Sequence, residues 1–192
     1  MAAFGGPWMA LSRRTLIHAA LAAAGVASLA GLATLAEHRV ALGPTDSAGF
    51  RPIPWPFRPD IWPPGRAWRG NDLDVYVRVK PGMCGDCETG IVSDEALDRA
   101  VEIDRLDSRF APAGDGRRVR VTDLYGRARL YSHRMRYRSL RHAEGITVAY
   151  KCDLVVALID GDMVDQARRR MAYRFLESNT VQIWVNRQLA ER

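Results

Sequence analysis

A run of 22 residues, from Thr15 to Ala36, contains no Asp, Glu, Lys or Arg. As a helix rising about 1.5 Å per residue it would be roughly 33 Å long, enough to cross the hydrocarbon core of a bilayer. Arg13 and Arg14 precede the run and little charge excess follows it, so the arginine end is expected to stay in the cytoplasm. The sequence therefore predicts one N-terminal hydrophobic helix, with the rest of the chain delivered across a membrane.

The start of this segment also carries a motif. A serine, two arginines, one further residue and two bulky apolar residues follow one another as Ser12, Arg13, Arg14, Thr15, Leu16 and Ile17. This order resembles the start of a twin-arginine export signal, and such signals use a weakly hydrophobic, Ala- and Gly-rich stretch like the one that follows. The resemblance implies that Arg13 and Arg14 direct the export of an already folded domain. Residues 1–36 are expected to be a signal peptide cleaved near Ala36 or a single membrane anchor.

Prolines dominate the next segment. Seven of the ten prolines of the chain fall between Pro44 and Pro64, interleaved with tryptophan and phenylalanine. Proline lacks a backbone N–H and fixes φ, so such a run favours extended polyproline II geometry over a helix or a sheet interior. Residues 37–66 are predicted to form an extended tether, whose proline-rich part would span up to ~65 Å. Its aromatic side chains would either lie on the domain or the membrane interface, or bind an aromatic groove.

The positive charge of the chain is unevenly distributed. The whole chain has a formal net charge of +6, whereas residues 67–192 carry 22 basic and 19 acidic side chains. Half of the apparent basicity therefore belongs to the leader and the tether. The isoelectric point is no evidence for nucleic-acid binding, and we expect no nucleic acid among the partners.

Residues 67–192 are long enough for one hydrophobic core and too short for two. Leu73 to Val79 alternates apolar and polar residues and predicts a strand. The continuous apolar run Leu154 to Ile159 predicts a central strand covered on both faces. Ser139 to Tyr150 fits either a helix or a strand, because a capping serine opens it while Gly145 and β-branched residues follow.

A hairpin is the clearest local prediction in this region. Arg118 to Leu124 and Arg127 to Tyr131 alternate in register around Tyr125 and Gly126, where the turn is expected. The inner face of the hairpin would hold Val119, Val121, Ala128 and Leu130.

Two helices and a last strand complete the predicted fold. Ser93 or Asp94 is expected to cap the first helix, and Asp162, at the end of a turn, the second. Val181 to Val185 is predicted to close the domain as a strand. Because strands and helices do not alternate strictly, we expect an α+β class: a small single domain with a mixed sheet and packed helices.

Cys84 and Cys87 form a Cys-x-x-Cys motif directly after the strand predicted to end at Val79. A strand leading into this motif resembles the thioredoxins and glutaredoxins, in which the helix that follows lowers the pKa of the first thiol. The resemblance implies a thiol–disulfide oxidoreductase, with Cys84 as the nucleophile and Cys87 as the resolving thiol.

Two other interpretations of the cysteines stay open. A zinc-type site would combine Cys84 and Cys87 with Cys152 and either His142 or His133, because a closed zinc site needs four ligands. A structural role, which needs no cofactor, would pair two of the three cysteines in a disulfide and bury the third. Cys152 precedes the predicted central strand, so we expect it to lie near the cysteine pair.

Arginines crowd the predicted hairpin. From Arg117 to Arg141 there are nine arginines and one acidic residue. Such a face binds anions, which outside the cytoplasm are lipid head groups, acidic partners, or phosphorylated or carboxylated ligands. The opposing interpretation is that six acids between Asp94 and Asp107 neutralise the hairpin. The residues assigned to a ligand- or partner-binding face are Arg118, Arg120, Arg127 and Arg129.

These features predict an exported accessory or assembly protein that binds a protein partner or an anionic ligand without catalysis. It is expected in the periplasm, free or anchored to the inner membrane through its N-terminal segment. The alternatives are a thiol–disulfide oxidoreductase and a zinc-type metal-binding module, and both depend on Cys84 and Cys87. The sequence contains no nucleophile elbow, phosphate loop or zinc-protease helix.

Overall fold

A computed structural model of the chain describes residues 18, 21–28, 31, 44–70, 72–83, 93–135 and 139–191. The chain separates into two compact units, Met1–Gly43 and Pro44–Arg192. In the first unit residues 21–28 are helical, and no helix among the described residues is long and apolar enough to span a membrane. Arg13 and Arg14 lie outside the described residues, so the hydrophobic helix and the export signal stay predictions.

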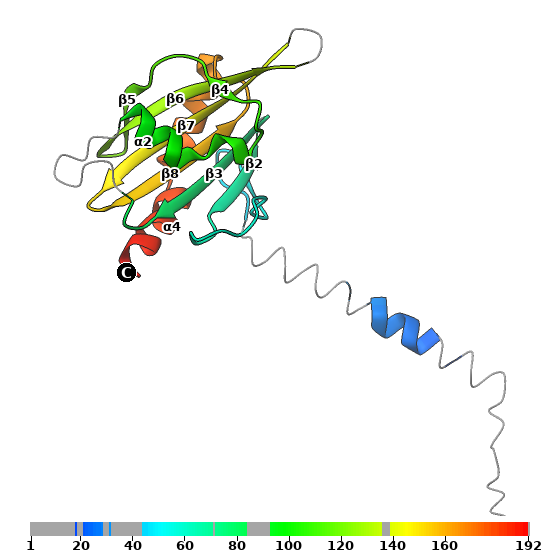
Figure 1. Cartoon of the computed structure of the whole chain (residues 1–192). Coiled ribbons are helices and arrows are strands. Elements are labelled where there is room, and N and C mark those ends of the chain that lie inside the picture. Colours follow the sequence, from blue (N-terminus) through cyan, green and yellow to red (C-terminus); the bar gives the residue numbers. More distant parts are fainter. Residues whose placement is uncertain are drawn as a thin grey trace, which may run out of the picture. The chain divides into compact units, whose positions relative to one another are not determined.

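The second unit is an α+β fold built on one sheet of eight strands (Figure 1). The strand order is β1-β2-β3-β8-β7-β6-β4, and β5 also pairs with β6. The α+β class is confirmed, but all pairings between the described strands are antiparallel, so the expected mixed sheet is wrong. The strands are β1 (Arg51–Ile53), β2 (Arg66–Gly70), β3 (Leu73–Lys80), β4 (Ala111–Pro112), β5 (Arg117–Val121), β6 (Leu124–Arg134), β7 (Leu140–Tyr150) and β8 (Asp153–Asp160).

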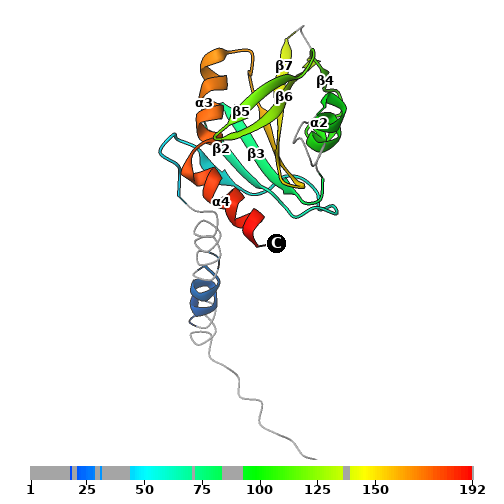
Figure 2. The ribbon, with the colours of Figure 1, turned by 90° about the vertical axis from the view of Figure 1, so that its left-hand side faces the viewer.

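Helices cover both faces of the sheet (Figure 2). Two helices, α3 (Gln166–Leu176) and α4 (Asn179–Ala190), pack on one face, which we call the α3/α4 face. Helix α2 (Asp94–Val101), followed by the short 3-10 helix η1 (Ile103–Arg105), packs on the other, the α2 face. Gly145 on β7 lets α2 approach closely, because a Cβ atom there would lie 2.7 Å from a methyl group of Val101.

The centre of the sheet explains why one stretch of sequence is continuously apolar. β8 lies between β3 and β7, with Ile159 and Ala157 in the core of the α3/α4 face. Leu158 and Val156 belong to the core of the α2 face. Both faces of β8 are therefore buried, and the predicted central strand is confirmed.

The proline-rich segment is part of the second unit. β1 lies within it and pairs with β2, and Phe50, directly before β1, is fully buried and stacks on Phe175 with ring centroids 4.1 Å apart. Phe57 makes an edge contact with Tyr76 at 4.9 Å. Residues 44–66 are thus folded onto the sheet and do not form an extended tether. Proline excludes a helix from this stretch, but burying each aromatic ring contributes about 2–3 kcal/mol toward holding it on the sheet.

The predicted hairpin is present, with its turn in a different place. β5 and β6 are joined at Thr122 and Asp123, because Val121 pairs with Leu124. The predicted turn at Tyr125 and Gly126 is therefore wrong. Thr122 has a φ of 54°, in the left-handed region that glycine enters more easily, so no glycine in the sequence marks the turn that forms. The predicted inner face is confirmed: Val119, Val121 and Ala128 are buried, and Leu130 packs against the same core.

Two further segments in the C-terminal third of the chain form one strand and one helix. The ambiguous segment Ser139 to Tyr150 contains strand β7. The predicted strand Val181 to Val185 is wrong, because these residues belong to α4. Val181, Trp184 and Val185 are buried at helical spacing and form the face of α4 that packs on the sheet.

The helix caps match the sequence prediction at one helix and differ at the other. Ser93 caps α2, and its hydroxyl accepts a hydrogen bond from the N–H of Ala96 at 3.2 Å. α3 is capped by Asp165, which accepts from the N–H of Ala167 at 2.7 Å. The prediction that Asp162 caps this helix is therefore wrong. Asp162 instead lines a hollow in the surface.

Candidate functional site

The cysteines divide between described and undescribed parts of the chain. Cys84 and Cys87 lie outside the described residues, so a thiol–disulfide activity stays a prediction. Cys152 lies in the turn between β7 and β8, with an exposed and free thiol, so neither burial nor a disulfide applies to it. The N–H of Gly82 donates to Asp153 Oδ1 at 2.9 Å, which places the end of β3 beside this turn.

The predicted set of four zinc ligands is wrong because two of its members lie far apart. His142 is near the start of β7, whereas Cys152 follows the end of this strand. Ten residues of extended chain separate them by about 30 Å, too far to share one metal ion. The alternative ligand, His133, is buried on β6 beside Phe110. The described residues contain no group of three or more His, Cys, Asp or Glu side chains able to hold a metal.

Two of the four hairpin arginines are neutralised by α2. Arg127 forms an ion pair with Asp94, and Arg129 Nη1 lies 2.6 Å from Asp98 Oδ2. The hydrogen bond from Arg127 is the largest cause of a lowered pKa at Asp94. The acidic residues Asp94 and Asp98 of α2 therefore neutralise Arg127 and Arg129.

The other two hairpin arginines project from the outer strand. Arg118 and Arg120 on β5 are exposed. The guanidinium of Arg118 lies 4.4 Å from the ring centroid of Tyr125, which is itself 54% exposed. Arg120 pairs at 2.8 Å with Asp123, whose side chain is 94% exposed. Because exposed ion pairs are weak, both arginines remain available to a partner.

A buried charged cluster lies beneath the proline-rich segment. Lys80 is 1% exposed, and its Nζ lies 2.9 Å from Glu102 Oε2. Burial is the main cause of a lowered pKa at Lys80. Its neighbour Arg78 donates to Asp60 at 2.9 Å. The cavity here has a volume of about 30 Å³, which leaves room for water but not for a larger ligand.

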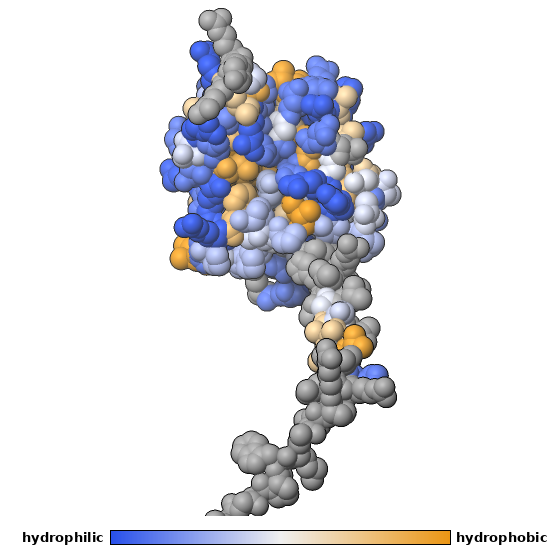
Figure 3. All heavy atoms as spheres, turned by 90° about the vertical axis from the view of Figure 1, so that its right-hand side faces the viewer, coloured by the Kyte–Doolittle hydropathy of each residue, from blue (hydrophilic) through white to orange (hydrophobic). Residues whose placement is uncertain are grey.

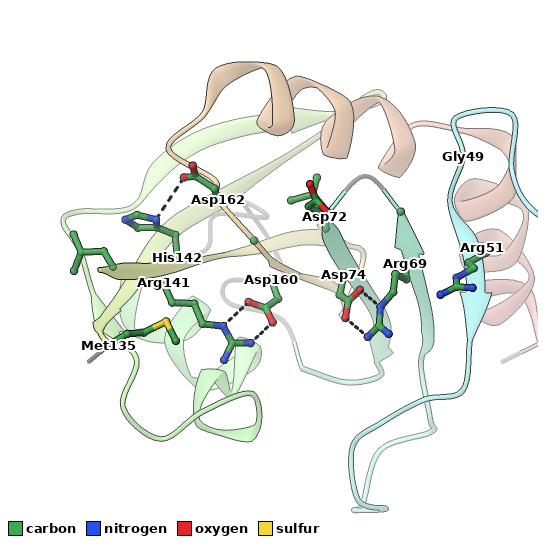
Figure 4. Close-up of a pocket in the computed structure, with 14 residues that line it drawn as sticks. Gly49, Arg51, Arg69, Asp72, Asp74, Met135, Arg141, His142, Asp160 and Asp162 are labelled. Carbon is green, nitrogen blue, oxygen red and sulfur yellow. Dashed lines mark hydrogen bonds and ion pairs between the residues drawn. The ribbon is translucent and has the colours of Figure 1, made fainter. Parts of the chain in front are cut away.

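A large hollow lies at one end of the sheet, where β2 ends, β3 begins and β8 ends (Figure 4). Its volume is about 810 Å³, and it is open to solvent. Arginines and aspartates from several strands and turns line it. Its ionisable lining residues are Arg51, Arg69, Arg141, Asp72, Asp74, Asp160, Asp162 and His142.

Strand register builds part of this lining as a row across the sheet. Arg51 on β1 is the partner of Arg69 on β2, and Arg69 is the partner of Asp74 on β3. Asp74 is in turn the partner of Asp160 on β8. Cross-strand partners point to the same face with Cβ atoms about 5 Å apart. The α2 face therefore carries two cations followed by two carboxylates.

Two arginines neutralise the adjacent carboxylates. Arg69 donates to both oxygens of Asp74, at 2.7 and 2.6 Å. Arg141 Nε donates to Asp160 Oδ1 at 3.1 Å, and a second hydrogen bond joins the same two side chains. The hydroxyl of Tyr76 also donates to Asp74, and burial followed by the Asp74 charge raises the pKa of Tyr76. These pairs offset the repulsion between neighbouring aspartates.

Arg51 supplies the positive charge that is left over. Its side chain is exposed and makes no ion pair or hydrogen bond with any residue that the structure describes. Its neighbour in register, Arg69, is already bound to Asp74. The β1 side of the hollow is therefore locally positive.

The other side of the hollow is locally negative. Asp72 and Asp162 have side chains that are 87% and 47% exposed, and both share Arg168, at 3.8 and 3.6 Å. His142 Nδ1 lies 3.5 Å from Asp162 Oδ1. In Figure 4, Asp162 and Arg51 stand on opposite sides of the hollow. One end thus suits an anion and the other a cation.

Hydrophobic side chains do not gather into one broad area on the face seen in Figure 3. Where the structure describes this face, hydrophilic side chains surround small separate hydrophobic patches. Obligate protein interfaces resemble a cut hydrophobic core and would show a larger apolar area. A ligand or partner of this face is therefore expected to bind through polar contacts.

Comparison with models of known protein families gives no match, and comparison with curated proteins gives none either. The functional argument therefore rests on the geometry of the hollow and of the hairpin.

Proposed function

We propose that the protein is an exported, non-catalytic binding module whose hollow receives a dipolar ligand. Such a ligand carries a carboxylate or phosphate group together with an ammonium group. The observation that supports this function most directly is the unpaired Arg51, set across the hollow from Asp162. The separation of charge along the strand register, with two arginines followed by two aspartates, is the second support.

The anionic group of the ligand would bind at Arg51 and at the outer edge of Arg69. A guanidinium presents several N–H donors in one plane and forms charge-assisted hydrogen bonds with carboxylates and phosphates. Arg69 keeps 53% of its side chain exposed while it holds Asp74, so it can add to the field at this end.

The ammonium group would bind at Asp72 and Asp162. These carboxylates share one arginine at 3.6 Å or more, which leaves lone pairs free to accept from an ammonium. A volume of about 810 Å³ lies within the usual range for small-ligand sites, roughly 300–1,000 Å³. Because the hollow is open and wet, we expect modest affinity.

Export and a periplasmic or membrane-anchored location belong to the same proposal. They rest on the uncharged 22-residue run and on Arg13 and Arg14. A binding module on that side of the membrane would meet free peptides, amino acids and lipid head groups, and all three include dipolar compounds.

Isothermal titration of the full-length chain, kept in mild detergent, with a short dipeptide tests the hollow. We expect binding to the free dipeptide, and loss of binding when its amino end is acetylated or its carboxyl end amidated. Arg51→Gln should weaken binding by about tenfold, the usual scale for a lost hydrogen bond to a charged group.

The matched control is Arg58→Gln, which removes an exposed arginine outside the hollow. Equal loss of binding in both variants would mean that net charge alone attracts the ligand. Equal binding of the free and blocked dipeptides would contradict a dipolar site.

A further inference from the structure

The outer strands of the sheet differ in how well they could accept another strand. β1 has three residues, including Pro52, and β4 has two, including Pro112. Short strands with proline are poor templates, because proline lacks the N–H that a ladder needs. β5 has five residues and no proline, and among the described strands it pairs with β6 alone. Of these three strands, β5 therefore offers the longest open edge.

The register of the hairpin determines which backbone groups face this edge. A two-residue turn is closed by a hydrogen-bonded pair, here Val121 and Leu124, and such pairs recur at every second residue. Val119 and Arg117 therefore bond inward to β6. The N–H and C=O groups of Arg118 and Arg120 point outward, where no described strand meets them.

The start of β5 is held in position before any partner arrives. The N–H of Gly116 donates to Asp94 at 2.9 Å, and Arg117 Nη2 donates to the buried carboxylate of Glu144 at 2.5 Å. Val119 and Val121 are buried in the core of the α3/α4 face. An edge that is already extended loses little conformational entropy when a strand is added.

The side chains at the edge select the chemistry of the added strand. Arg118 and Arg120 lie on the same side of β5, beside the exposed ring of Tyr125. A second copy of this chain would bring the same arginines to the edge, and like charges facing each other destabilise a strand pair. An acidic segment would instead form cross-strand ion pairs with both arginines.

We infer that β5 accepts an extended acidic segment of a partner protein as an additional strand. Backbone hydrogen bonds to Arg118 and Arg120 supply one part of the affinity, and acidic side chains at alternate positions supply the other. This surface is separate from the hollow, so it does not depend on the proposed ligand.

Fluorescence anisotropy with synthetic peptides tests this surface on the full-length chain in mild detergent. The probe is a labelled peptide of alternating glutamate and valine, blocked at both ends. We expect it to bind, and to bind about tenfold more weakly when salt is raised from about 0.05 to 0.5 M, because exposed charges are screened. A peptide with lysine in place of glutamate should not bind.

N-methylation separates strand addition from simple charge attraction. Methyl groups on alternate peptide nitrogens remove backbone donors and leave every charge in place. One of the two possible methylation patterns should weaken binding by at least about tenfold, because only one set of donors faces β5. Equal binding of the unmodified peptide and both methylated peptides would overturn the proposal.

Protein variants give the complementary test. Arg118→Gln combined with Arg120→Gln should weaken binding by about tenfold or more. The matched control combines Arg170→Gln with Arg174→Gln, which removes two exposed arginines from α3. Far-ultraviolet circular dichroism checks that both variants are folded. Equal weakening by the two double variants, or a peptide-free dimer that the hairpin variant dissociates, would overturn the proposal.

Discussion

The two faces of the same sheet bury side chains of different chemistry. On the α3/α4 face, the ring of Trp68 lies 5.5 Å from that of Phe175 and 6.3 Å from that of Trp184. Phe50 completes this aromatic cluster by stacking on Phe175. The buried charged residue described on this face is Glu144, which is paired with an arginine.

The α2 face instead buries basic side chains. Arg78, Lys80 and His133 are each 5% exposed or less. Their carboxylate partners come from loops and from the end of α2, as with Glu102, which binds Lys80 from a left-handed backbone conformation with φ 50°. A non-glycine residue in that conformation is strained, so its position is determined by the surrounding contacts.

The two faces are therefore expected to have different roles, one in stability and the other in positioning. Burying aromatic rings against one another stabilises the fold. A buried ion pair adds little net stability, but removing one of its two partners is costly because the other charge stays buried and unpaired. The α3/α4 face is therefore expected to account for most of the free energy of unfolding. The α2 face is expected to hold the proline-rich segment and η1 in defined places.

The largest expected effect is on the aromatic face. Phe175→Ala removes a fully buried ring that touches Phe50 and Trp68, so we expect a loss of about 3–5 kcal/mol in the free energy of unfolding. Urea unfolding followed by tryptophan fluorescence measures it. Ile183→Ala, on the exposed side of α4, is the control and should change stability by less than about 0.5 kcal/mol. A loss below about 1 kcal/mol for Phe175→Ala would remove the contrast between the faces.

A smaller and asymmetric effect is expected on the α2 face. Glu102→Gln leaves the buried ammonium of Lys80 without its partner and should cost about 2 kcal/mol, reduced because Glu102 is partly exposed. Lys80→Met leaves Glu102 close to Arg105 and should cost less than about 1 kcal/mol. Urea unfolding of both variants measures the difference. Equal losses would show that the pair acts as an ordinary surface ion pair.

The same pair also predicts a pH dependence. Because burial lowers the pKa of Lys80, the unfolded chain binds the proton more tightly than the folded one. Stability should therefore rise with pH between the folded pKa and the ordinary value of about 10.4, and this rise should be absent in Lys80→Met. From about pH 10 upward the raised pKa of Tyr76 acts in the opposite direction. Unfolding of the two proteins in parallel isolates the contribution of Lys80.

The smallest expected effect lies outside both faces. Cys152 is exposed in a turn, so Cys152→Ser should leave stability unchanged within about 0.5 kcal/mol. In the native protein its thiol should react with a thiol reagent at the rate of a free cysteine. Labelling that requires prior reduction would reveal a disulfide with Cys84 or Cys87 and would restore the structural interpretation of the cysteines.

Local patterns predicted the parts of the fold that depend on burial. The continuous apolar run Leu154 to Ile159 identifies a strand with two buried faces, since no solvent-facing residue interrupts it. Val181 to Val185 was assigned wrongly because five residues with valine at both ends fit either period. A longer window reaching Leu189, which packs against the same core, indicates the helix.

The hollow was beyond prediction because strand pairing assembles it. Arg51, Arg69, Asp74 and Asp160 become neighbours only through the register of four strands. Arg69 and Asp74 are only five residues apart, at the two ends of the β2–β3 turn. Their opposite charges were the one local signal in the sequence for part of the hollow. The arginines of the hairpin were visible in the sequence, but which of them α2 neutralises depends on the packing of that helix.

The position of β1 has a mechanical consequence. The chain enters this compact unit shortly before this outer strand, so a pull on the segment before Pro44 reaches β1 once the hydrogen bond from the Thr180 hydroxyl to Asp46 is broken. Three residue pairs join β1 to β2, and the ring of Phe50 is the first deeply buried group that the pull reaches. Arg51 belongs to the same strand, so tension that peels β1 away also withdraws this guanidinium from the hollow. Force on the N-terminal segment and release of a bound anion would then be coupled, and the central strands would stay intact.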